Sequence, residues 1–311
     1  MGAEEGMTRQ THATILLGAG LALLVLAALD HYLPRKQATA PPAQVAAAAT
    51  PASAGTAPPE PPPPAPAPRP EPEPTTPVAK QPQLPPTDRG DFSPTPVEPL
   101  VFTHVKTDAR CVALTFDCCQ TQKPAGYDHK IIETLISTQT PATFFLGGRW
   151  IEAHPDAVAE LASIPYFELE NHSYLHPHMP KIAVAAAHDE LAKTQQLLQS
   201  HTGRPAAYYR PPFGEFNRKV TAEAAALGMQ SVLWDVSTGD PDRSFTASDI
   251  LTEFRRARPG SIIIMHANGR GWHTAEALPR ALKWLDEKNL RPVTLSDLLQ
   301  QGTPVPAGHK G

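Results

Sequence analysis

Two contrasting patterns of hydrophobic and polar residues divide the chain. Up to about residue 100, the sequence carries one apolar run followed by a tract rich in proline and alanine. From residue 101 onward, short apolar and β-branched runs alternate with segments whose apolar residues recur every three or four positions. Alternation of strand-type and helix-type periodicity predicts an α/β fold of repeated βα units, with a parallel sheet or barrel at its centre.

The individual elements can be placed from these runs. Strands are predicted at 111–117, 140–146, 167–170, 231–236, 261–266 and 292–294. Helices are predicted at 128–137, 155–163, 182–199, 219–227, 247–256, 274–287 and 296–300. In folds of this class the loops after the strands carry the chemistry, so we look for functional residues there.

An uncharged apolar run of 17 residues, 13–29, precedes the βα region. A membrane-spanning helix needs about 17–25 such residues, and the apolar core of a signal peptide is usually shorter. The run predicts that residues 1–36 are a signal anchor or, alternatively, a cleaved signal peptide. We therefore expect a membrane partner and an extracytoplasmic protein, either anchored in the inner membrane facing the periplasm or cell wall, or secreted.

Proline is concentrated in the segment that follows this run. The chain holds 37 prolines, of which 21 lie between residues 41 and 100. Proline is excluded from helix interiors and central strands because it lacks the N–H group. Residues 37–100 are therefore predicted to form a disordered linker, residues 101–302 the catalytic domain and residues 303–311 a tail. The net charge of −4 argues against a nucleic acid partner.

Ionisable residues follow the ends of several predicted strands. Asp117 and His266 end two apolar runs, and Asp240 follows a third. His172 and His176 are four residues apart, a spacing at which both can face one metal ion. Each of these residues has an ordinary structural explanation by itself, but the ordered set indicates a catalytic site.

These motifs resemble those of the polysaccharide deacetylase family, the NodB-homology carbohydrate esterases. The corresponding segments, in chain order, are 115–117, 172–177, 210–214, 234–240 and 264–266. The resemblance implies a distorted, incomplete (β/α) barrel. It also implies a metal-dependent hydrolase that removes acetyl groups from an N-acetylated or O-acetylated polysaccharide, such as peptidoglycan or a chitin-like oligomer.

The resemblance implies a general base and a general acid. By position, Asp117 is the base that takes a proton from water, and His266 is the acid that protonates the leaving group. Arg210 would tune Asp117, and Asp240 would tune His266, because a nearby opposite charge favours the ionised form. Ser237 stands where the family has an aspartate in the fourth motif, so Asp235 stays an alternative to Asp240.

The resemblance also implies a metal and a substrate pocket. His172 and His176 would ligate a divalent metal that polarises the acetyl carbonyl. The backbone N–H of Phe213 would bind the oxyanion, and Ile264 would line the pocket for the acetyl methyl group. Trp272 lies in a glycine-rich loop, where it can stack on a sugar ring or pack on the domain surface.

The first motif departs from the family pattern at the position of the third metal ligand. The family has a second aspartate where this chain has Cys118, followed by Cys119. Because catalytic zinc usually has three protein ligands, Cys118 is the candidate third ligand, and its sulfur favours zinc. Cys118 can instead be a packing or redox residue. The third ligand would then be Asp117 itself, Asp128 or Glu170, or the metal is lost.

The third cysteine of the chain lies too far away to complete this site. Cys111 and Cys118 are separated by roughly 23 Å along one strand, which excludes a disulfide between them. We expect Cys111 to be a buried small residue. A bridge between the adjacent Cys118 and Cys119 would be strained.

Two functions of other classes stay open on this evidence. One is a metal-free glycan-binding module tethered by the linker. The other is a zinc hydrolase acting on a different amide or ester.

Overall fold

The computed structural model of the protein describes residues 94–120 and 125–308. The predicted membrane-targeting run 13–29 and nearly all of the predicted linker lie outside these residues, so both stay predictions. Across the part of the chain that the structure describes, no helix combines the length and the apolar character needed to cross a membrane.

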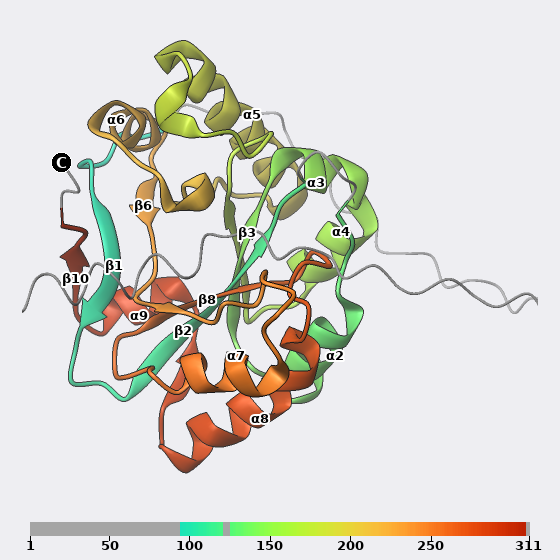
Figure 1. Cartoon of the computed structure of the whole chain (residues 1–311). Helices are drawn as coiled ribbons and strands as arrows, with labels where there is room; N and C mark the ends of the chain where they lie inside the picture. The colour runs from blue at the N-terminus through green and yellow to red at the C-terminus, as the bar shows by residue number, and fades with distance from the viewer. Residues whose placement is uncertain (1–93, 121–124, 309–311) are drawn as a thin grey trace, which may run out of the picture. The chain divides into compact units, whose positions relative to one another are not determined.

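A ten-stranded sheet forms the centre of the described domain, in the order β10-β1-β6-β5-β4-β3-β2-β8-β7, with β9 paired to β2. The strands are β1 (Val101–Lys106), β2 (Cys111–Cys118), β3 (Ala142–Leu146), β4 (Phe167–Asn171), β5 (Tyr208–Tyr209), β6 (Gln230–Val232), β7 (Val236–Ser237), β8 (Ile262–His266), β9 (Arg291–Val293) and β10 (Thr303–Pro306). The pairing of β1 with β10 is antiparallel, whereas the other strand pairs are parallel. The sheet is curled, which confirms the predicted distorted, incomplete barrel (Figure 1).

Helices follow most strands and surround the curled sheet (Figure 1). They are α2 (His129–Ser137), α3 (Gly148–Ala153), α4 (Pro155–Ser163), α5 (Val184–Thr202), α6 (Arg218–Ala226), α7 (Ala247–Phe254), α8 (Thr274–Glu287) and α9 (Leu295–Gln300), with short 3₁₀ turns η1 (Met179–Lys181) and η2 (Pro212–Gly214). Local sequence explains several starts. Thr246 and Asp249 form a capping box at α7, and the Asn217 side chain accepts the Val220 N–H at α6.

The eight residues of β2 are all buried, and alternate side chains enter two different hydrophobic clusters. Leu114, Phe116 and Cys118 pack in the larger cluster with residues of the surrounding helices. Cys111 and Ala113 belong to a second cluster, which also contains residues of β1, β8 and α9. Successive side chains of a strand point to opposite faces, so Asp117 and Cys118 face opposite sides of the sheet.

The prediction of one strand over 231–236 is wrong in part, because this run forms two short strands. β6 pairs with β1 and β5, whereas β7 pairs with β8 at the other end of the strand order. Between them, the Leu233 N–H donates to the Phe102 carbonyl at 2.8 Å and the Asp235 N–H to the Ile262 carbonyl at 3.2 Å. One bent run therefore hydrogen-bonds to strands from both ends of the order, which curls the sheet.

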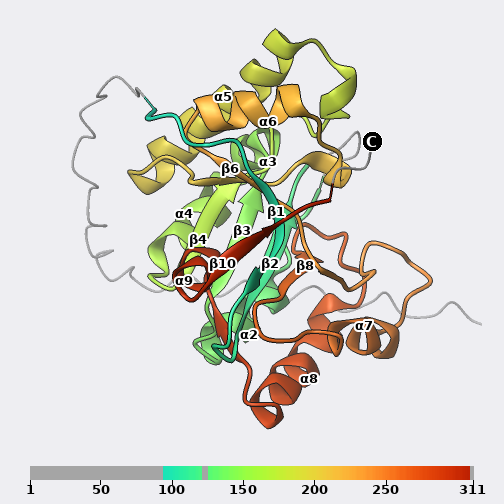
Figure 2. The ribbon, with the colours of Figure 1, turned by 90° about the vertical axis from the view of Figure 1, so that its left-hand side faces the viewer.

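The sequence did not predict the edge of the sheet. Residues 303–306, assigned to the tail, form β10 and pair with β1, which was also missed (Figure 2). The end of the predicted linker also contacts the domain, since the Val97 N–H donates to the Ala225 carbonyl at 3.0 Å. The folded unit therefore extends beyond residues 101–302 at both ends.

Candidate active site

Asp117 is held by a buried arginine. The Arg210 Nη1 donates to Asp117 Oδ1 at 2.8 Å, and both side chains are buried. Arg210 lies directly after β5, with its guanidinium 4.0 Å from the centre of the Phe145 ring and its Nη2 donating to the Leu233 carbonyl at 3.3 Å. Packing and hydrogen bonds thus fix the guanidinium in one position against the carboxylate.

The charges around Asp117 keep it ionised. Burial opposes ionisation, but the nearby positive groups outweigh burial and hold the pKa of Asp117 below its ordinary value. Burial also lowers the pKa of His172, so this imidazole is neutral at neutral pH. Arg210 is therefore the permanent cation that stabilises the Asp117 carboxylate.

His172 follows β4 and turns one ring nitrogen toward Asp117. Its Nδ1 lies 2.8 Å from the Arg210 carbonyl oxygen, which only accepts hydrogen bonds, so Nδ1 carries the proton. The unprotonated Nε2 then lies 3.4 Å from Asp117 Oδ2. Two atoms bearing lone pairs face each other here, an arrangement that a cation between or beside them would stabilise.

His176 lies close to His172 in a strained loop. Its backbone has φ of 59°, in the left-handed region, and its ring centre lies 4.9 Å from that of His172. Burial and His172 lower the pKa of His176 to about 3, so it is also neutral. Its Nδ1 is buried and has no hydrogen-bond partner among the described residues. Both imidazoles are thus in the state that binds metals.

The structure brings Cys119, and not Cys118, to the two histidines. The Cys119 sulfur and one nitrogen from each of His172 and His176 lie within 4.8 Å of one another. Cys118 is the last residue of β2 and packs in the larger hydrophobic cluster, so its selection as the third ligand is corrected. The reason is strand alternation, since the neighbour of Asp117 in a strand points away from the site that Asp117 faces.

The other carboxylates considered for the metal are engaged elsewhere. Asp128 Oδ2 accepts the Gly269 N–H at 2.8 Å. Glu170 accepts the N–H groups of Ala207 and Tyr208 and pairs with Arg204 at 3.2 Å. Within residues 94–120 and 125–308, the group containing Cys119 is the only one of its kind. The three cysteines are buried and unbridged, as expected for Cys111.

A second ion pair lies on the strand next to Asp117. His266 ends β8 and is the register partner of Asp117 on β2. The His266 Nδ1 lies 2.9 Å from Asp240 Oδ1, and its backbone N–H donates to Oδ2 at 2.7 Å. Burial disfavours the imidazolium, but Asp240 outweighs burial and raises the pKa of His266. Asp235 instead accepts the Ile262 N–H at 2.8 Å, so the choice of Asp240 over Asp235 agrees with the geometry.

The remaining predicted residues lie around this pair of sites. Phe213 has φ of 60° and is 55% exposed, and its ring centre lies 4.6 Å from that of His176 and 4.3 Å from that of His178. Ile264 lies two residues before His266 on β8 and is nearly buried. Trp272 is 43% exposed, with the Arg243 guanidinium 4.1 Å from its ring centre.

Supporting residues that the sequence did not reveal hold these groups. Glu190 of α5 accepts the N–H groups of Tyr174 and Leu175, within the loop that carries both histidines. The Thr274 hydroxyl donates to Asp240 Oδ2 at 2.7 Å. A Cβ on Gly271 would lie 2.5 Å from the His266 carbonyl oxygen, so only glycine fits there. Such contacts join distant segments, so no local sequence pattern announces them.

Comparison with known proteins agrees with this geometry. A family model described as polysaccharide deacetylase matches residues 104–232, which include Asp117, both histidines and Arg210. The chain belongs to the polysaccharide deacetylase family. Its fold is the one found in the CE4 branch of that family. It is similar to the solved structure of a CE4 family pseudoenzyme from Bacillus anthracis, with a TM-score of 0.59 and 27% identity over 65% of this chain and 70% of that one.

Curated relatives of this deacetylase-family chain act on several polysaccharides. It is 29% identical over 224 residues to a peptidoglycan-N-acetylglucosamine deacetylase of Bacillus cereus, covering 70% of this chain and 79% of that protein. It is 32% identical over 153 residues to a bifunctional xylanase/xylan deacetylase of Cellvibrio japonicus. That match covers 49% of this chain but 22% of the Cellvibrio protein, so the chain spans about a fifth of that relative.

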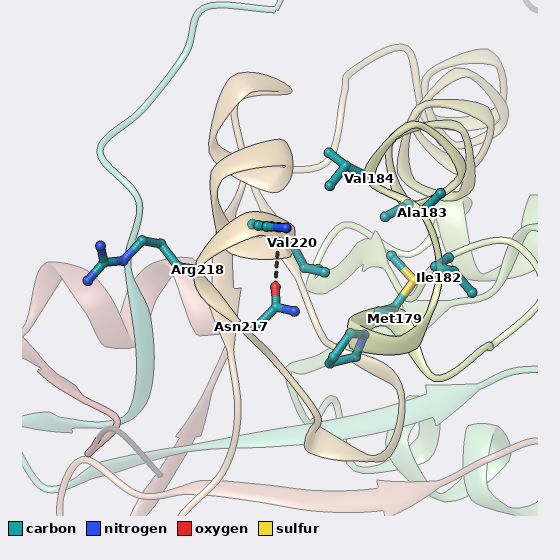
Figure 3. A pocket seen from close by; sticks show the side chains of 10 residues that line it. Met179, Ile182, Ala183, Val184, Asn217, Arg218 and Val220 are labelled. Carbon is teal, nitrogen blue, oxygen red and sulfur yellow. Dashed lines mark hydrogen bonds between the residues drawn. The ribbon is translucent and has the colours of Figure 1, made fainter. Parts of the chain in front are cut away.

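A separate cavity of about 400 Å³ lies between η1 and the amino-terminal ends of α5 and α6 (Figure 3). Its lining includes Met179, Ile182, Val184 and Val220, and it contains no histidine, cysteine or carboxylate. The chemistry of this deacetylase-family domain therefore lies at Asp117 and His266 rather than in this larger cavity.

Proposed function

We propose that this protein is a metal-dependent hydrolase that removes acetyl groups from an N-acetylated glycan such as peptidoglycan or a chitin-like oligomer. The observation that carries the proposal is the convergence of a paired carboxylate, a paired imidazole and a group of metal-binding side chains. Asp117 and His266 are register partners on adjacent strands, and His172 lies 3.4 Å from Asp117.

The metal would be held by His172 and His176, with a third ligand considered below. When bound, a divalent metal polarises the acetyl carbonyl and lowers the pKa of water. The donor set fits such an ion, because both imidazoles are neutral and the buried His176 Nδ1 has no partner among the described residues. We propose zinc, for which nitrogen and sulfur ligands are typical.

Asp117 would act as the general base. Its carboxylate is ionised beside Arg210, so it can accept a proton from the attacking water. The bond from water oxygen to the acetyl carbon forms as this proton moves to Asp117. Arg210 positions the carboxylate without donating a proton itself, because a guanidinium is not deprotonated in proteins.

His266 would act as the general acid. Asp240 raises its pKa, so the imidazolium is available to protonate the leaving nitrogen as the bond from that nitrogen to the acetyl carbon breaks. The products are acetate and the free amine. The Phe213 N–H would stabilise the oxyanion, Ile264 would contact the acetyl methyl group, and Trp272 would stack on a sugar ring.

The relatives support the substrate class. Similar proteins include peptidoglycan-N-acetylglucosamine and chitooligosaccharide deacetylases. The apolar run 13–29, outside the described residues, supports a protein that works at a membrane or beyond it, where such polymers are found.

The proposal is tested by incubating the zinc-loaded full chain with chitooligosaccharides and with peptidoglycan fragments. We expect equal amounts of acetate and of new primary amine. Acetate without new amine would indicate removal of O-acetyl groups instead. The absence of both products, with metal bound, would contradict the proposal.

A second candidate function is glycan binding without catalysis. It is favoured by the likeness to a CE4 pseudoenzyme, of which a mutant has restored enzymatic activity. This function predicts binding to the acetylated glycan without acetate release. Calorimetric titration with chitooligosaccharides, run beside the acetate assay, separates the two.

A further inference from the structure

We propose that Cys119 supplies the third protein ligand, so that the metal is held by one thiolate and two imidazoles. This inference rests on the metal site of the proposed function. It concerns the chemical nature of that site rather than the reaction. Three protein ligands are typical of catalytic zinc and leave one position open for water or substrate.

Cys119 is placed for this role by the end of β2. Cys118 is the last residue of the strand, so the chain leaves the regular alternation at Cys119. The side chain of Cys119 is 3% exposed and reaches the histidines, whereas that of Cys118 remains in the hydrophobic cluster on the helix side. A metal-binding sulfur at this position is therefore sheltered from solvent.

The surrounding residues fix the backbone of Cys119. Asn268 Nδ2 donates to the Cys119 carbonyl at 2.7 Å and lies 3.7 Å from its sulfur. A Cβ on Gly147 would lie 3.3 Å from the Cys119 Cα, so a larger residue there would push on the cysteine. Outer contacts that orient metal ligands in this way usually contribute strongly to metal affinity.

The donor atoms fit one ion after a small contraction. They lie within 4.8 Å of one another. Zinc–sulfur and zinc–nitrogen bonds of about 2.3 and 2.0 Å place tetrahedral ligands about 3.3–3.6 Å apart. The group therefore needs to close by about 1 Å, within the reach of small rotations of the three side chains.

A thiolate in the ligand set changes which metals bind. Sulfur favours zinc and cobalt(II) over magnesium, manganese and calcium, which prefer oxygen ligands. With three ligands supplied by Cys119 and the histidines, Asp117 is not required on the metal. Its pair with Arg210 can then persist while the ion is bound, which leaves Asp117 free to act as the base.

The test is cobalt(II) titration of the full chain after chelation, followed by absorption spectroscopy. We expect one cobalt per chain and a sulfur-to-cobalt charge-transfer band in the near ultraviolet. Cys119→Asp should bind cobalt without this band and bind manganese more tightly than the parent protein does. Cys119→Ser should lose the band and weaken cobalt binding at least tenfold.

Cys118→Ala is the matched control, since Cys118 faces the hydrophobic cluster. It should keep both the band and the stoichiometry, with folding of each variant checked by circular dichroism. One cobalt bound to the parent protein without the band would overturn the inference, and so would a band that survives in Cys119→Asp or Cys119→Ser.

This experiment also separates the inference from the proposed function. A charge-transfer band without acetate release would support Cys119 as a ligand and contradict the deacetylase proposal. Acetate release by the cobalt-loaded protein without the band would do the reverse.

Discussion

The pair formed by Asp240 and His266 offers a sharp test of the proposed general acid. Asp240→Asn keeps the size of the side chain but removes its charge. The structure shows the carboxylate bonded to the His266 ring at 2.9 Å, to the His266 N–H at 2.7 Å and to the Thr274 hydroxyl at 2.7 Å. The substitution therefore removes the group that raises the pKa of His266.

The magnitude follows from the distance between the charges. Opposite unit charges 2.9 Å apart attract by roughly 6 kcal/mol at an effective dielectric constant of 20. This is an upper limit, because the amide still accepts a hydrogen bond and water replaces part of the lost charge. Neighbouring opposite charges typically shift a pKa by about 1–3 units. We expect the pKa of His266 to fall by about this amount in Asp240→Asn.

The assay is the dependence of kcat/KM for acetate release on pH at saturating metal. The general acid works only when protonated, so the parent protein loses activity as pH rises through the raised pKa of His266. In Asp240→Asn this alkaline limb should move to lower pH by about 1–3 units, with a drop of roughly 10²-fold or more at neutral pH. Asp235→Asn is the control, because Asp235 bonds to Ile262 and not to His266. Its alkaline limb should stay in place.

The same substitution has a stability signature with a defined sign. The folded-state pKa of His266 is raised, so the pair stabilises the fold fully below the ordinary histidine pKa of about 6.5, and this contribution is lost as pH rises through the raised value. Asp240→Asn should therefore lower the midpoint of thermal unfolding more at pH 5 than at pH 9. An unmoved alkaline limb together with a uniform loss of stability would refute the role given to Asp240.

Further substitutions test the parts that hold the site. Arg210→Met leaves the Asp117 carboxylate buried without its partner, so urea unfolding should show a loss of about 3–5 kcal/mol, and the acidic limb of the pH profile should move to higher pH. Gly271→Ala forces a Cβ against the His266 loop and should lower kcat at least tenfold in the acetate assay, whereas Gly308→Ala, in open space, should match the parent. Glu190→Ala frees the loop carrying the two histidines, so metal affinity measured by chelator competition should fall about 10–100-fold.

Much of the fold could be predicted because its elements have strong local patterns. The run 111–117 became β2, with every residue buried, and the capped segment 247–256 contains α7. The strand over 231–236 was only partly right, because hydrophobicity does not show where a strand bends to reach both ends of a sheet. β1 and β10 were missed, since short edge strands rich in polar residues or proline resemble loops.

The site was predictable as a set of residues but less so as a set of contacts. Strand alternation alone implies that Cys118 points away from Asp117, and this rule, applied to the sequence, would have selected Cys119. The choice between Asp240 and Asp235 required the structure, since it depends on which carboxylate a loop brings to His266.

The central claim is that this domain hydrolyses acetamido groups with Asp117 as the base. The most direct measurement compares acetate release from chitooligosaccharides by the zinc-loaded parent protein and by Asp117→Asn, with zinc content determined for both. The account predicts acetate release by the parent and a loss of roughly 10²–10⁴-fold in the variant, at equal zinc content. Equal rates in the two proteins, or no release by a fully zinc-loaded parent, would contradict it.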